Sequence, residues 1–76
     1  MRPLPLALGL VSLALTRALT HTGQLQLAEQ IANARLKRVP DDLDVRTARA
    51  RAWFAAGLVQ EAADEFAAVL KEVPRH

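Results

Sequence analysis

Apolar residues recur along this chain at spacings of three and four, which is the pattern of amphipathic helices. Good helix formers outnumber β-branched residues, so the chain is expected to be all-α. The clearest apolar stripe lies near the C-terminus, at Ala62, Ala63, Phe66, Val69, Leu70 and Val73.

Three interruptions divide this pattern into four helices. Gly23 and Gly57 each supply a turn, since glycine adopts a positive φ without a Cβ clash. Pro40 ends one helix because proline cannot continue it, and the aspartates that follow accept hydrogen bonds from the free N–H groups of the next first turn. We therefore predict helices within residues 6–22 and over about 24–38, 43–56 and 58–72.

The chain repeats itself with a period of 34 residues. Pro40 and Pro74 are 34 residues apart, and so are Gly23 and Gly57. Residues 9–42 and 43–76 share 12 identical positions, whereas a composition so biased gives about three or four by chance. In the first copy these positions are Val11, Ala14, Arg17, Ala18, Gly23, Gln26, Ala28, Ala34, Leu36, Lys37, Val39 and Pro40. We divide the chain into an N-terminal extension (1–8), a first repeat (9–42) and a second repeat (43–76) that form one structural domain.

The second repeat carries a spacing that resembles the tetratricopeptide repeat. That family's helix-turn-helix unit places an aromatic residue late in its first helix, an alanine nine residues later, an aromatic four after that and a proline eight further on. The second repeat matches with Trp53, Ala62, Phe66 and Pro74, and the first has Leu19, Ala28, Ala32 and Pro40 at the equivalent places. The resemblance covers residues 9–76 and implies an α-solenoid of two tandem repeats.

The first helices depart from the family pattern. The family usually has an aromatic, a leucine and a glycine where the second repeat has Arg46, Arg49 and Ala50. An unpaired buried arginine would be costly, so Arg49 is expected to reach solvent, pair with an acid or meet a partner. Asp42 and Arg46 have the spacing of a helical i, i+4 ion pair.

Three acidic residues fall in the first half of the last helix, at Glu61, Asp64 and Glu65. Like charges placed so closely repel one another unless they reach solvent or meet a cation. We expect these residues to belong to a solvated or partner-facing acidic face.

The resemblance also implies a binding surface. First helices of this family line a concave groove that receives an extended peptide or a chain end, and the matching positions are Arg17, Thr20, Thr47, Arg51 and Phe54. Arg17 and Arg51 lie one repeat apart and are suited to clamp carboxylates, although solvated helix arginines are the alternative. We therefore expect an interaction module that binds a peptide or helix of a partner protein.

The sequence offers little evidence for other classes of function. The net charge is only +2, with acids and bases interspersed, so nucleic acid is not an expected partner. The chain has no cysteine and only two distant histidines, His21 and His76, so we expect neither a metal site nor a cofactor. No phosphate loop or nucleophile motif is found, and we predict that the protein is not an enzyme.

The N-terminal region leaves alternatives open. Residues 4–15 are apolar except for Ser12, so residues 4–19 resemble a signal or membrane anchor, although the run is too short to span a bilayer. Four of the repeat identities fall in this region, which favours a packed first helix in a cytoplasmic protein over a membrane-associated or exported one. The first helix is unusually apolar for an end helix, and the stack has only two units. We therefore expect a partner or a second copy to cover this helix. A self-assembling structural protein is therefore the other alternative.

Overall fold

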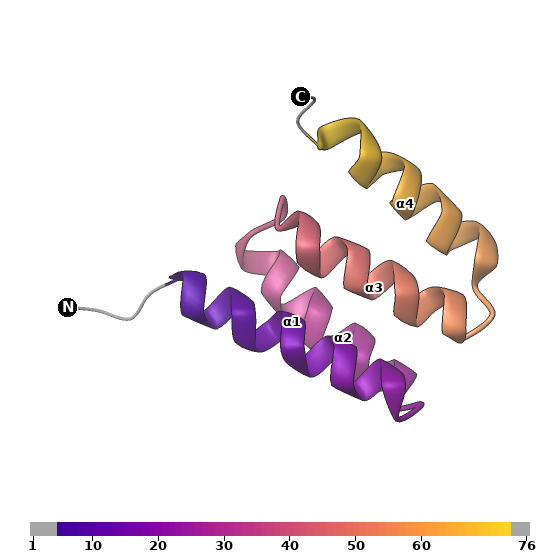
Figure 1. Ribbon diagram of the computed structural model, residues 1–76, viewed down its shortest axis with the longest axis horizontal. Coiled ribbons are helices and arrows are strands. Elements are labelled where there is room, and N and C mark those ends of the chain that lie inside the picture. The colour runs from indigo at the N-terminus through magenta and orange to yellow at the C-terminus, as the bar shows by residue number, and fades with distance from the viewer. Residues whose placement is uncertain (1–4, 74–76) are drawn as a thin grey trace.

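Four α-helices joined by three short turns make up the part of the protein that the structure describes (Figure 1). The computed structural model describes the backbone of residues 5–73 and the side chains of residues 9–73, and this part of the chain has no strand. The helices are α1 (Pro5–His21), α2 (Leu25–Arg38), α3 (Leu43–Ala55) and α4 (Val59–Glu72). The all-α prediction is therefore confirmed, and each predicted helix boundary agrees to within one residue, α1 beginning one residue before the predicted range. Helix α1 already begins inside the segment taken as an N-terminal extension, while residues 1–4 and the second repeat's Pro74 lie outside the described residues.

The two glycine turns have the same geometry one period apart. Gly23 has a φ of 79° and Gly57 a φ of 88°, as predicted. The N–H of Gln24 donates to the carbonyl of Leu19 at 2.8 Å, and the N–H of Leu58 donates to the carbonyl of Trp53 at 2.9 Å. This reach across six residues closes a helix in the Schellman manner. Sequence identity at the glycines is thus matched by identity of backbone structure.

Helix α3 is central to the arrangement. It contacts α1, α2 and α4, whereas α4 contacts α3 alone (Figure 1). The buried apolar residues are small, so the helix axes approach closely. They are Ala28, Ala32, Val45, Ala48, Ala50, Ala52, Ala62 and Val69.

The junction between α2 and α3 depends on Asp42. Its carboxylate accepts from the N–H of Val45 at 3.3 Å and so caps α3, as predicted for this position. The same carboxylate pairs with the Nε of Arg35 at 2.9 Å. The expected pair between Asp42 and Arg46 is therefore wrong: Arg46 instead reaches across to α4, where it pairs with Glu65 and Glu72. Because the carboxylate of Asp42 already caps α3 and pairs with Arg35, its acceptor oxygens are occupied without the i, i+4 partner Arg46.

A polar network joins α2, α3 and α4 around Arg49. Its Nη2 lies 2.6 Å from the carboxylate of Glu65, its Nη1 donates to Asn33 at 2.9 Å, and its guanidinium stacks 4.5 Å from the ring centroid of Trp53. Trp53 Nε1 donates to Glu29 at 2.9 Å. Of the outcomes expected for Arg49, pairing with an acid is the one that occurs.

Glu65 lies inside this network rather than on an acidic surface. Its side chain is only 11% exposed, and it accepts from both Arg46 and Arg49. The predicted acidic face is therefore wrong for Glu65, because two arginines of α3 neutralise it, while Glu61 and Asp64 are exposed as expected.

Only part of the predicted apolar stripe of α4 is buried. Ala62 and Val69 face the core, but Leu70 is 72% exposed and Val73 46%. Helix α4 has a single neighbour, so one helix cannot cover the whole stripe.

Replacing Ala62 by leucine tests the close approach of α3 and α4. Ala62 is 1% exposed, so three further carbons have no room and Ala62→Leu should cost roughly 1–3 kcal/mol of unfolding free energy. The exposed neighbour provides the control, since Ala63→Leu should change stability by less than about 0.5 kcal/mol. Urea denaturation followed by circular dichroism measures both, and equal stabilities would contradict the packing.

Glu65→Gln tests the polar network through its pH dependence. Burial pushes the pKa of Glu65 upward, but hydrogen bonds from Arg46 and Arg49 outweigh it, so the pKa lies below its ordinary value. A carboxylate with a depressed pKa stabilises the fold above its unfolded-state pKa, and this stabilisation is lost as pH falls through the folded-state pKa. We expect Glu65→Gln to cost about 2 kcal/mol at neutral pH.

The difference between this variant and the wild type should shrink as pH falls below 4.5, the ordinary pKa of a glutamate. Glu61→Gln is the matched control, because Glu61 is exposed on the same helix and forms no ion pair with a described side chain. A difference that stays constant between pH 7 and acid would show that Glu65 contributes shape rather than charge.

Candidate functional site

The predicted binding residues come from two helices that lie side by side. Arg17 and Thr20 are three residues apart on α1, and Thr47, Arg51 and Phe54 follow one another at spacings of four and three on α3. Each set therefore shares one helical face. Helices α1 and α3 are in contact, so the two faces can form one surface.

Two adjoining hollows lie between these helices. One, of about 240 Å³, is lined by Leu13, Arg17, Asp44, Thr47, Ala48 and Arg51. The other, of about 160 Å³, is lined by Arg17, Thr20, His21, Ala48 and Arg51. They share the two arginines and Ala48, which is 4% exposed and forms the floor. We refer to the two together as the α1–α3 groove.

The groove brings together four of the five predicted residues. Arg17, Thr20, Thr47 and Arg51 all line it. Phe54 does not: its ring is 61% exposed near the end of α3. The prediction for Phe54 as a groove residue therefore finds no support in the lining, although it shares the helical face of Arg51.

The groove is positively charged. Arg17 and Arg51 are both exposed, and no carboxylate within residues 9–73 lies within ion-pair distance of either. Asp44 is the one acidic residue of the lining. The arginines at 35, 46 and 49, in contrast, are all paired. The guanidinium groups that remain available to an anion among the lining residues are thus the two that lie one repeat apart.

The two threonines present acceptors to the groove. Thr20 donates its hydroxyl hydrogen to the carbonyl of Thr16 at 2.8 Å, and Thr47 donates to the carbonyl of Leu43 at 2.9 Å. A hydroxyl has one hydrogen and two lone pairs. With the hydrogen used within the helix, each threonine can accept from an N–H of a ligand.

Four lining residues were absent from the predicted site: Leu13, Asp44, His21 and Ala48, the last of which lies three residues before Arg51. Helical periodicity would have found them. Leu13 and His21 lie four residues on either side of Arg17, and Asp44 lies three before Thr47. Of these, Asp44 matters most, because a carboxylate in the lining competes with an acidic ligand for the arginines.

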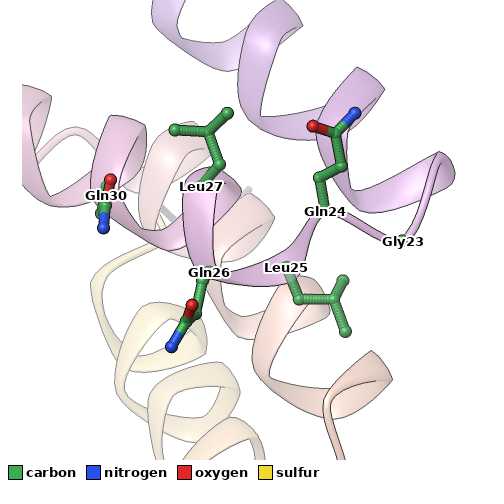
Figure 2. A pocket seen from close by; sticks show the side chains of 6 residues that line it. All are labelled: Gly23, Gln24, Leu25, Gln26, Leu27 and Gln30. Carbon is green, nitrogen blue, oxygen red and sulfur yellow. The ribbon is translucent and has the colours of Figure 1, made fainter.

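Two further hollows lie away from this groove. The turn between α1 and α2 borders one of about 480 Å³, lined by Gly23, Gln24, Leu25, Gln26, Leu27 and Gln30. Figure 2 shows that the side chains of Gln26 and Leu27 point in opposite directions, and none of the lining residues is ionisable. The other, of about 220 Å³ between α1 and α2, is lined by Val11, Ser12, Ala34, Arg35 and Arg38. Neither combines unpaired charges from two repeats.

Neither a metal-binding cluster nor a membrane-spanning helix occurs among the described residues. No group of three histidine, aspartate or glutamate side chains among them could hold a metal ion. None of the described helices is both long enough and apolar enough to cross a membrane.

Comparison with known protein families, with curated proteins and with solved structures found no match to this chain.

Proposed function

We propose that this protein is a helical-repeat interaction module of the tetratricopeptide type that binds a peptide or helix of a partner protein in the α1–α3 groove. The observation that carries this proposal is the position of Arg17 and Arg51, which line the same hollows and have no ion-pair partner among the described side chains. The 34-residue self-similarity and the two identical glycine turns support the repeat assignment. The proposal takes residues 4–19 as a packed first helix in a cytoplasmic protein.

The chemistry of the groove favours an extended segment that carries a carboxylate. A guanidinium binds a carboxylate through two parallel hydrogen bonds, which fixes orientation as well as affinity. Because the hydroxyls of Thr20 and Thr47 donate within their own helices, their oxygens can accept from the N–H groups of an extended backbone, and Ala48 offers an apolar floor. The segment would therefore place an acidic side chain or a chain-terminal carboxylate between the arginines.

The size of the groove favours recognition over enclosure. The groove is divided into two hollows of about 240 and 160 Å³, each smaller than the roughly 300–1,000 Å³ of pockets that enclose small-molecule ligands. A ligand would rest along the surface, with only a few of its residues in contact.

Selection of peptides from a random library, followed by NMR titration of the ¹⁵N-labelled protein, tests the proposal. Selected peptides should contain Asp, Glu or an essential free C-terminus. Their binding should shift the amide signals of residues 17–21 and 44–51, and peptides with the acids replaced by amides should not. Shifts confined to other helices, or selected peptides without a carboxylate, would contradict the proposal.

Arginine variants should then weaken binding. Arg17→Ala and Arg51→Ala should each reduce affinity by roughly 10- to 150-fold, since a charge-assisted hydrogen bond is worth about 1.5–3 kcal/mol. Arg38→Ala is the control, because Arg38 is exposed on α2 outside the groove. Asp44→Asn should strengthen binding, since it removes the competing carboxylate. Isothermal titration calorimetry measures all four, and equal effects of Arg38 and Arg17 would indicate attraction by overall charge alone.

A further inference from the structure

The two repeats use the same residues in different surroundings. Val45, Ala48 and Ala52 are buried on α3, which the whole first repeat packs against. Their equivalents one period earlier are identical residues, Val11, Ala14 and Ala18, and all three are exposed on α1. Among the described helices, α1 contacts only α2 and α3, so no other repeat lies against this side of it. The exposed side of α1 therefore has the residues of a surface that, on α3, receives another repeat.

The same comparison holds at the other end of the protein. Leu36 and Val39 are only partly exposed near the end of α2, which α3 covers. Their identical equivalents, Leu70 and Val73, are 72% and 46% exposed on and just after α4, which contacts only α3 among the described helices. Leu25 and Val59 differ in exposure in the same way. The outer side of α4 therefore resembles the side of α2 that packs on the next repeat.

The polar contacts between the repeats give a sharper comparison. Inside the protein, α2 meets α3 through Glu29 with Trp53 and through Asn33 with Arg49, each at 2.9 Å. One period later, the α2 residues become Ala63 and Ala67, both exposed on α4. One period earlier, the α3 residues become Leu19 and Leu15 on α1.

Both members of each polar pair are thus replaced by apolar residues at the free ends. A junction that brought α4 of one chain against α1 of another would set alanine against leucine at both points, with no buried charge left unpaired. Such coordinated replacement avoids the cost of an unsatisfied polar group.

We propose that a second copy of this chain docks head to tail, its α1 packing on α4 of the first copy as α3 packs on α2 within the chain. The contact would join the face of α1 made by Val11, Ala14, Leu15 and Ala18 to the face of α4 made by Ala63, Ala67, Leu70 and Val73. This interface does not depend on the α1–α3 groove and stands apart from the proposed peptide binding.

The two faces are different, so the contact is heterologous. After docking, each end of the pair still presents one free face, and assembly can continue into an open array. A two-fold dimer, in contrast, would use the same face of both copies and stop.

Two charge-introducing variants test this arrangement. Leu15→Glu blocks the α1 face and Ala67→Glu blocks the α4 face, and both positions are exposed in the single chain, so each variant should fold. Gln30→Glu is the control, because this exposed position is matched by an acid, Asp64, in the second repeat. Sedimentation velocity over a dilution series measures mass, and circular dichroism confirms folding.

The wild type and the control should increase in mass with concentration, and each blocked variant alone should stay monomeric. An equimolar mixture of the two blocked variants should form a dimer that grows no further. The Leu15→Glu variant keeps its α4 face and the Ala67→Glu variant keeps its α1 face, so these two faces pair and the blocked faces remain at the ends. A monomeric wild type at its highest soluble concentration would overturn the proposal. Blocked variants that still associate as the wild type does, or that fail to pair with each other, would overturn it too.

Discussion

The packing of α3 against all three other helices is the constraint on which the rest of this structure depends. Half of the buried apolar residues lie on α3 (Val45, Ala48, Ala50 and Ala52), and most of the core is alanine. Alanine buries little area, so it contributes little hydrophobic free energy for each residue. It does allow helix axes to approach closely, which fixes the angle and register of the neighbours. The groove depends on the same property, since Ala48 is its floor.

A core so poor in large side chains leaves room for polar contacts at the helix boundaries. Arg49 of α3 links α2 to α4, because it binds both Asn33 and Glu65, while the backbones of α2 and α4 each contact α3 but not one another. The desolvation of buried ion pairs offsets much of their attraction, so they contribute more to the choice of one arrangement than to stability. The ion pairs of this network hold α4 against α3, since apolar contacts cover only part of the apolar stripe of α4.

The distribution of free groups follows from the repeat. Arg35, Arg46 and Arg49 pair with acids, whereas Arg17 and Arg51 line the groove between α1 and α3 and have no ion-pair partner among the described side chains. Apolar residues that meet another repeat inside the chain are covered, and their equivalents at either end are exposed. Peptide binding in the groove and head-to-tail association at the ends use different surfaces, so one chain can support both.

The sequence by itself determined the helices and their boundaries. Glycine at two turns, proline with a capping aspartate at the third, and a period of 34 residues are local properties, and backbone sterics and capping act over a few residues. The same period, read through the family resemblance, located four groove residues, because equivalent positions on packed repeats face the same way.

Only the tertiary structure decided which charges meet. Asp42 lies four residues before Arg46 in sequence, yet its carboxylate binds Arg35, and Arg46 binds acids of α4. The sequence predicted that Glu65 belongs to an acidic surface, whereas in the fold Arg46 and Arg49 of α3 bind its carboxylate. Long side chains at a helix boundary can reach several partners, and the choice among them depends on how helices distant in sequence are placed. Exposure of Leu70 and of Phe54 has the same origin, since a helical pattern shows which residues share a face but not which faces find a neighbour.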